Sequence, residues 1–169
     1  PDAVSYLAYG LPAKIPMPTI IWLGSSLLGL LFLRYTRFGR GIYAVGGGEE
    51  AARLSGIQPA WYRIFPYAAS GFFAALVGVM MSGRMGCGDP KIGQGWELDA
   101  IAAVVIGGTS LSGGKGSVGG TVVGVLIMGL VINIMNLLEI EAYPQAMAKG
   151  IIIVAALALH SALSRRRAP

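Results

Sequence analysis

Few residues in this chain have side chains suited to chemistry, and none has the spacing of a catalytic or metal site. Gly114, Gly116 and Gly119 match the G-x-G-x-x-G pattern, which binds a dinucleotide only after a strand and inside a βαβ unit. A long apolar run follows them instead, so we reject that site. A P-loop is excluded because Gly116, rather than Ser or Thr, follows Lys115. We therefore expect this chain to have no catalytic residue, no metal site and no bound cofactor.

Two carboxylates precede a short apolar run. Glu97 and Asp99 stand before residues 100–106, a segment that is too short to cross a bilayer alone. Ionisable groups near a membrane are costly and often line a pathway. The alternative is that both lie at the interface and interact with the N-terminal dipole of a helix. Asn133 and Asn136, inside a later apolar run, are more typical of hydrogen bonds between helices.

The most polar continuous stretch covers residues 46–57. Glycines bracket it, which predicts a short helix with free ends. Glu49 and Glu50 fall in its first turn and Arg53 near its last, the order that the helix dipole favours. Such a helix, presented between two spans, can insert into a groove on a soluble partner. The alternative is a capped loop helix that contacts nothing.

Composition defines the environment of these segments. The chain is 54% hydrophobic and 12% charged, and the charged fraction is roughly half that of a typical soluble domain. We therefore predict an all-α integral membrane protein, a polytopic helical bundle within the lipid bilayer. The net charge of +5 does not indicate nucleic-acid binding, because the arginines cluster in loops beside the apolar runs, where they set topology.

The apolar runs predict about five membrane passes, one of them short and broken. Residues 1–18 are expected to form a periplasmic or interfacial loop, and residues 164–169 a cytoplasmic tail. Residues 34–63 are expected to be a cytoplasmic loop, because arginines dominate them. Pro66 is placed in the first turn of the second span, where proline is tolerated. The predicted transmembrane segments are 19–33, 64–81, 97–110, 118–138 and 143–163, with a GxxxG contact at Gly120 and Gly124.

Three runs, 36–47, 49–57 and 94–114, closely resemble the permease subunits of bacterial ribose-type sugar ABC importers, within the branched-chain amino acid/ribose permease superfamily. The resemblance covers about residues 15–163 and corresponds to the C-terminal half of such a permease, so residues 19–163 would be a permease domain. The family usually has Asn where Gly48 stands, Tyr where Trp96 stands and Arg where Lys115 stands.

The resemblance implies a permease subunit that carries a ribose-like monosaccharide across the bacterial inner membrane as a multi-pass protein. Its implied partners are two ABC ATPase subunits, which would bind ATP-Mg, a periplasmic sugar-binding protein and a second, identical or different, permease subunit. The polar stretch would be the coupling helix that docks on the ATPase, comprising Gly48, Glu49, Glu50, Ala51, Ala52, Arg53, Leu54, Ser55 and Gly56. The translocation pathway would include Glu97, Asp99, Thr109, Ser110 and Asn133.

Other functions remain open at this point. A permease of the same superfamily could carry a branched-chain amino acid, a nucleoside or a furanosyl signal molecule. A membrane scaffold would not require a charged helix bracketed by glycines. An intramembrane enzyme would need a catalytic pair, which the sequence does not contain.

Overall fold

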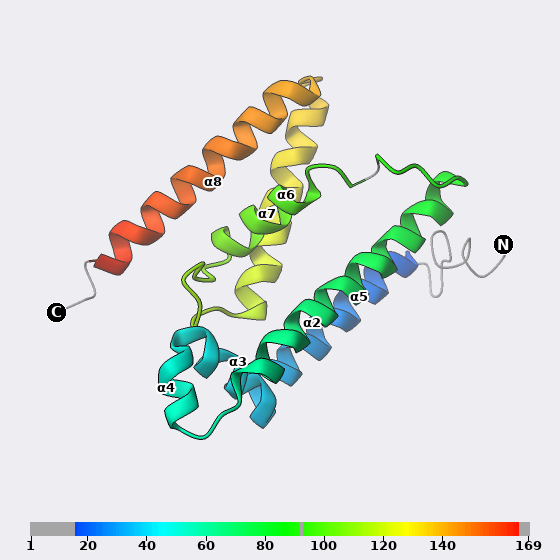
Figure 1. The fold of residues 1–169 in the computed structure, drawn as a ribbon. Helices are drawn as coiled ribbons and strands as arrows, with labels where there is room; N and C mark the ends of the chain where they lie inside the picture. The colour runs from blue at the N-terminus through cyan, green and yellow to red at the C-terminus, as the bar shows by residue number, and fades with distance from the viewer. Residues whose placement is uncertain (1–15, 92, 166–169) are drawn as a thin grey trace. The chain divides into compact units, whose positions relative to one another are not determined.

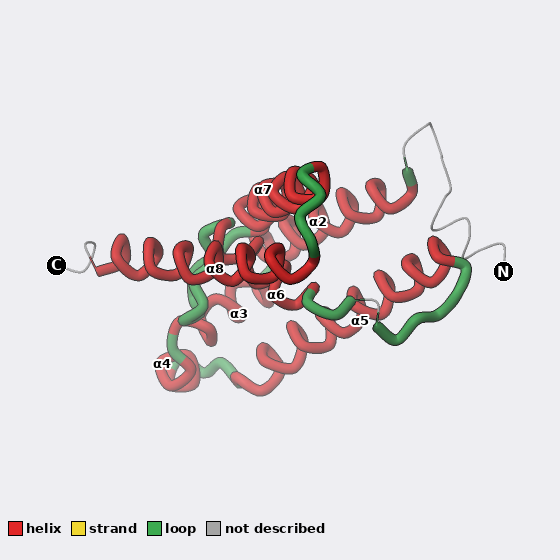
Figure 2. The backbone as a smooth tube through the Cα atoms, turned by 90° about the horizontal axis from the view of Figure 1, so that it is seen from above, coloured by secondary structure: helices red, strands yellow, loops and turns green. Residues whose placement is uncertain are grey.

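The computed structural model describes residues 16–91 and 93–165, and every regular element within these ranges is an α-helix, with no strand (Figure 2). Most of the expected loop 1–18 and of the expected tail 164–169 lies outside the described residues. The chain divides into two units, residues 1–92 and 93–169. We describe each unit by itself.

Two long apolar helices form the frame of the first unit. Helix α2 covers Met17–Tyr35 and helix α5 covers Pro59–Met85. Both are long and apolar enough to cross a membrane. They confirm the helices predicted around residues 19–33 and 64–81, although each extends beyond the predicted ends.

The position expected for Pro66 is wrong. Helix α5 begins at Pro59, so Pro66 lies inside the helix instead of in its first turn. Pro59 explains the early start, because its fixed φ angle and missing N–H suit the first helical positions. The polar residues before the apolar run thus continue the helix of the span instead of forming a loop.

The segment expected to be a cytoplasmic loop contains a helix that the sequence did not predict, α3, covering Arg37–Gly47. Thr36 starts it, because the Thr36 hydroxyl accepts a hydrogen bond from the Gly39 backbone N–H at 2.9 Å and donates one to the Phe32 carbonyl at 2.7 Å. A Cβ atom on Gly39 would overlap the backbone of Leu33. Glycine therefore lets α3 turn back closely against the end of α2.

An aromatic cluster holds α3 between the two long helices. It consists of Phe32 on α2, Phe38 on α3, and Tyr62 and Phe65 on α5. The Phe38 ring stacks on Tyr62 with centroids 4.6 Å apart and meets Phe65 edge-on at 5.1 Å. Phe32 stacks on Phe65 at 5.2 Å. Since aromatic pairs add to the free energy of simple burial, this cluster joins α2, α3 and α5 at one end of the unit.

The second unit consists of a short helix and two long ones. Helix α6 covers Trp96–Ile106, α7 covers Val118–Leu137 and α8 covers Ala142–Arg165 (Figure 1). At 11 residues, α6 has a length of about 16 Å, roughly half the thickness of the hydrocarbon core. The prediction of a short helix at this point is therefore confirmed.

Close backbone contact between α6 and α7 forms the centre of this unit. A Cβ atom on Gly120 would overlap the Gly107 carbonyl, and one on Gly124 would overlap the Ala103 carbonyl. The predicted GxxxG contact is thus confirmed, and its partner is α6. Ala102, Ala103 and Met128 are buried around the contact. Small residues bring helices this close in membranes, where packing drives association.

The length and composition of α2, α5 and α7 show that this is a membrane protein. The expected total of about five passes stays a prediction.

Candidate functional site

The short polar helix predicted between glycines is present as α4, covering Glu49–Leu54. Gly56, with φ +80°, ends it in the left-handed conformation that glycine adopts readily. The Gly56 N–H donates to the Arg53 carbonyl and the Ile57 N–H donates to the Ala52 carbonyl, both at 3.0 Å. These two bonds form a Schellman motif, which satisfies carbonyls that the helix end would leave free.

Helix α4 has an anchored side and an exposed side. The Ala52 side chain is buried at 3% exposure, whereas Leu54 is 81% exposed. Arg53 pairs with Glu50 at 2.8 Å, three residues apart on the exposed surface. Many apolar side chains of the described residues are exposed, but most of them lie on the long apolar helices, whereas Leu54 lies on a short polar helix.

An ion pair that the sequence did not predict ties α4 to α5. Arg63 donates to Glu49 Oε1 at 3.0 Å, and its second terminal nitrogen lies 2.9 Å from Oε2. The fork of the guanidinium thus matches both carboxylate oxygens. Both side chains are about half exposed, so the pair contributes about 1 kcal/mol or less. Sequence reasoning treated Arg63 only as a topology signal, and its pairing depends on how the helices pack.

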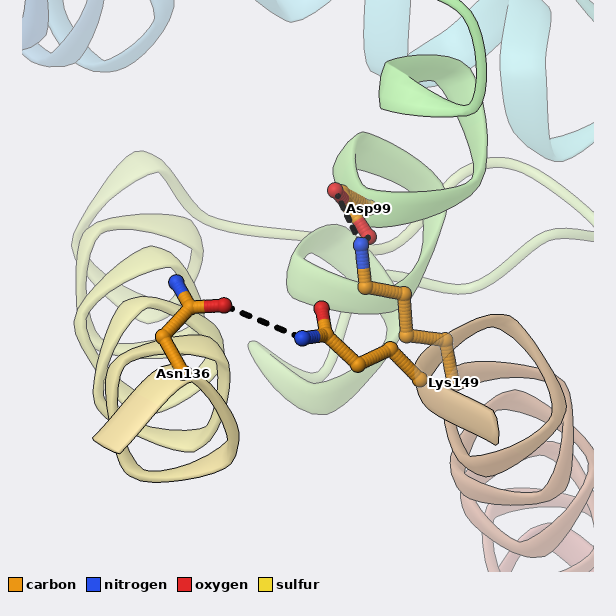
Figure 3. A network of polar contacts seen from close by, with 4 residues as sticks. Asp99, Asn136 and Lys149 are labelled. Carbon is orange, nitrogen blue, oxygen red and sulfur yellow. Dashed lines mark hydrogen bonds and ion pairs between the residues drawn. The ribbon is translucent and has the colours of Figure 1, made fainter. Parts of the chain in front are cut away.

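A second polar group lies in the other unit, where α6, α7 and α8 meet (Figure 3). The Lys149 ammonium lies 2.8 Å from Asp99 Oδ1 and 2.9 Å from Oδ2, and it donates a hydrogen bond to Oδ2. Both side chains are about one-fifth exposed. Lys149 was not among the predicted site residues, although an ionisable residue in an apolar helix is itself a signal for a partner.

Glu97 and Asp99 differ in their surroundings. Both lie in the first turn of α6, as the dipole interpretation expects, but neither caps the helix with a side-chain hydrogen bond. Glu97 is exposed, and it forms no ion pair with the described residues. Asp99 instead bridges to α8 through Lys149.

Two amides link α7 to α8 beside this pair. The Gln145 amide donates to Asn136 Oδ1 at 3.0 Å (Figure 3). It also donates to the Ile140 carbonyl at 2.8 Å. The expectation that Asn136 bonds between helices is therefore confirmed. Asn133 lies in the same part of α7, and its side chain is exposed.

Thr109 and Ser110 lie at the opposite end of α6 from Asp99. Both are partly buried, and the Ser110 N–H donates to the Lys115 carbonyl at 2.9 Å, which closes the glycine-rich turn. A Cβ atom on Gly116 would overlap the Thr109 side chain. The five predicted pathway residues therefore form no single cluster. Among the described residues there is also no group of three or more His, Cys, Asp or Glu side chains that could hold a metal ion.

Comparison with known proteins gives one family and a consistent set of relatives. Residues 2–157 match the family described as branched-chain amino acid transport system / permease component. The chain is 42% identical over 168 residues to the ribose import permease protein RbsC of Haemophilus influenzae, covering 98% of this chain and 51% of that protein. It is 43% identical to Escherichia coli (strain K12) RbsC, covering 92% of this chain and 49% of that protein.

A permease named for another sugar is equally similar. The chain is 43% identical to the xylose transport system permease protein XylH of Escherichia coli (strain K12), covering 93% of this chain and 39% of that protein. The chain spans about half the length, or less, of these relatives. No solved structure matches it significantly.

Proposed function

Because this chain belongs to the branched-chain amino acid transport system / permease component family, we propose that it forms part of the membrane-spanning subunit of an ATP-driven ABC importer. The solute that we propose is a ribose-like monosaccharide, since the relatives at 42–43% identity are named for ribose and xylose import. The proposed location is the bacterial inner membrane. ATP-Mg would be bound by the partner ATPases, and a periplasmic sugar-binding protein and a second permease subunit would complete the importer.

The observation that carries this proposal is the construction of α4. The helix is capped by a Schellman motif, anchored through Ala52 and tied to α5 through Glu49 and Arg63. Leu54 is left almost fully exposed. A short, firmly held helix with an exposed apolar residue fits a groove on a soluble partner. We therefore assign residues 48–56 to ATPase coupling, with Leu54 as the main contact and Ala52 as an anchor.

The connection to α5 supports a route for conformational coupling. Helix α5 is long and apolar enough to span the membrane, and Arg63 lies in its N-terminal part. A displacement of α4 by a moving groove would therefore be passed to a transmembrane helix. Such rigid-body movement of packed helices is a known form of switching.

Residues on α6 and α7 are the proposed lining of the translocation pathway. Glu97 and Asn133 are exposed. The carboxylate of Glu97 can accept hydrogen bonds from the hydroxyl groups of a sugar, and the amide of Asn133 can both donate and accept them. Asp99 would contribute through its ion pair with Lys149. Thr109 and Ser110 would serve the other end of α6.

The coupling role is tested in the complete importer, reconstituted in vesicles with its ATPase and binding protein. We expect Leu54→Asp to reduce uptake at least tenfold while the permease still inserts, because a charge at the centre of an apolar contact opposes docking. Leu111→Asp, the same substitution at an exposed leucine in the loop between α6 and α7, is the control for a general effect of surface substitution. If the Leu54→Asp variant takes up solute and binds the ATPase as the wild type does, the assignment of α4 is disproved.

The solute is tested separately by uptake of labelled ribose, xylose, leucine and a nucleoside into the same vesicles. Ribose or xylose uptake that requires ATP and the binding protein would support the proposed substrate class. Uptake of leucine or of the nucleoside, without uptake of either sugar, would show that the solute is not a monosaccharide. If the permease assembles with neither the ATPase nor the binding protein, and no solute is taken up with ATP, the function of a membrane scaffold is favoured.

A further inference from the structure

A basic surface lies at the junction of α2 and α3 and takes no part in the proposed coupling site. Arg34 is in the last turn of α2, and Arg37 and Arg40 are in the first turns of α3. All three are exposed. Residues 16–48 contain no Asp or Glu, so the segment has no acid of its own to neutralise them.

The nearest acids along the chain are already engaged. Glu49 pairs with Arg63, and Glu50 pairs with Arg53. Within the described residues, no ion pair reaches Arg34, Arg37 or Arg40. The three guanidinium groups therefore carry uncompensated positive charge.

The position of the cluster relative to the bilayer follows from the length of α2. Its 19 residues span about 28 Å, close to the roughly 30 Å of a hydrocarbon core. A helix of this length that crosses the membrane places Arg34 and exposed Tyr35 at the edge of the apolar region. The guanidinium carbon of Arg34 lies 5.8 Å from the centre of the Tyr35 ring. A tyrosine beside an arginine is typical of the level of the lipid headgroups.

Helix α3 follows this boundary and packs against the end of α2, where a Cβ atom on Gly39 would overlap the backbone of Leu33. Its aromatic residue Phe38 packs toward Phe32, Tyr62 and Phe65, while Arg37 and Arg40 remain exposed. Arg37 and Arg40 are three residues apart, so their side chains are neighbours on the helix surface. An amphipathic helix with arginines on its exposed side is suited to the membrane surface.

We propose that Arg34, Arg37 and Arg40 form a docking surface for the headgroups of anionic phospholipids. The arginine fork donates two parallel hydrogen bonds to a phosphate, and each basic residue close to a negative leaflet adds to the attraction. The position at the end of a transmembrane helix favours lipid over a soluble acidic protein. The proposal depends only on the membrane character of the chain, so it stands or falls separately from the transport function.

The test is native mass spectrometry of the intact chain in detergent, titrated with phosphatidylglycerol and phosphatidylcholine of identical acyl chains. We expect the wild-type chain to retain phosphatidylglycerol with higher affinity. Raising ammonium acetate from 0.1 to 0.5 M should reduce the preference, because the screening length then falls below about 5 Å.

Variants define the residues responsible. The triple variant Arg34→Gln, Arg37→Gln, Arg40→Gln should reduce the affinity ratio of the two lipids at least tenfold, given about fivefold for each basic residue. The triple lysine variant keeps the charge and should keep most of the ratio. Arg53→Gln, on the neighbouring α4 and paired with Glu50, is the control for removal of an exposed arginine and should have little effect.

Three outcomes would overturn the proposal. Equal affinity of the wild-type chain for both lipids would do so without any variant, and so would a full preference in a folded glutamine variant. Loss of ATPase binding in the glutamine variant, together with no lipid preference in the wild type, would assign the surface to a protein partner. If the glutamine variant fails to fold, two measurements still test the proposal. They are the salt dependence of the lipid preference of the wild type and the affinity ratio of the lysine variant.

Discussion

The ammonium of Lys149 lies between the two carboxylate oxygens of Asp99, at 2.8 and 2.9 Å, and thereby joins α8 to the first turn of α6. Helix α6 is also held by the close backbone contacts of Gly107 and Ala103 with α7. The short helix is therefore fixed between its two neighbours by different forces. An apolar pair would pack these helices at a lower desolvation cost, which points to a role of the ion pair in setting the helix register.

Removing the charge of Lys149 should destabilise the second unit. We expect Lys149→Met to lower the free energy of unfolding by about 1–3 kcal/mol, because it leaves the carboxylate of Asp99 without a counter-ion. The value is below that of a fully buried pair, since both side chains are about one-fifth exposed. Thermal unfolding in detergent measures the change. Lys91→Met removes an exposed lysine in a loop and should have almost no effect.

Exchanging the two charges should restore much of this loss. In the double variant Asp99→Lys, Lys149→Asp, the attraction between α6 and α8 is re-formed with reversed direction, so its unfolding temperature should exceed that of either single variant. A double-mutant cycle gives the coupling energy. Strictly additive effects of the two substitutions would show that the pair contributes nothing to stability.

The contact between α6 and α7 should be intolerant of a single methyl group. We expect Gly124→Ala to destabilise the unit by about 1–3 kcal/mol, because its Cβ would overlap the Ala103 carbonyl and force the helices apart. Gly129→Ala is the matched control on α7, since nothing lies within 4 Å of its Cβ position. Chemical unfolding in detergent compares them. Equal stability of the two variants would contradict the close contact.

Gly56, whose backbone is in the left-handed conformation, should be needed to end helix α4. Gly56→Ala should cost about 1 kcal/mol of local stability, since a residue with a Cβ atom resists φ near +80°. The measurable result is faster trypsin cleavage after Arg53, because proteolysis follows local unfolding. Gly48→Ala is the control, because Gly48 has extended backbone and its added Cβ would meet only the Ala51 Cβ, at 3.8 Å. Identical cleavage rates in both variants would argue against the Schellman end.

The aromatic cluster should determine how firmly α3 is held. Phe38→Ala removes a ring that contacts Phe32, Tyr62 and Phe65, and we expect a loss of about 2–4 kcal/mol. Faster hydrogen exchange of backbone amides in α3 would report the loss locally. In Tyr67→Ala, an 82% exposed ring on α5 is removed, so exchange in α3 should stay at the wild-type rate. Unchanged exchange in Phe38→Ala would show that the backbone alone holds α3.

Local properties of the chain were sufficient to predict the helical membrane class, the positions of most helices and the glycine-bounded α4. Hydropathy over about twenty residues reports membrane spans, and Gly56 ends α4 through its own conformational freedom. The same local reasoning placed the start of α5 too late and did not predict α3. Helix α5 begins among polar residues ahead of its apolar run. Helix α3 is a separate helix after Thr36, and aromatic rings from α2 and α5 stabilise it.

The order of residues along the chain specifies which polar side chains stand in an apolar setting, whereas the packing of the helices specifies which of them meet. Glu49 and Arg63 are 14 residues apart, and Asp99 and Lys149 are 50 apart. No periodicity within one helix predicts such pairs, because each depends on the approach of two separate helices. The helix dipole and the free-energy cost of an ionisable group near a membrane single out Asp99 as a candidate, but they do not predict its partner. Packing supplied the partner, because glycine contacts and ion pairs act only at the separation that the folded helices reach.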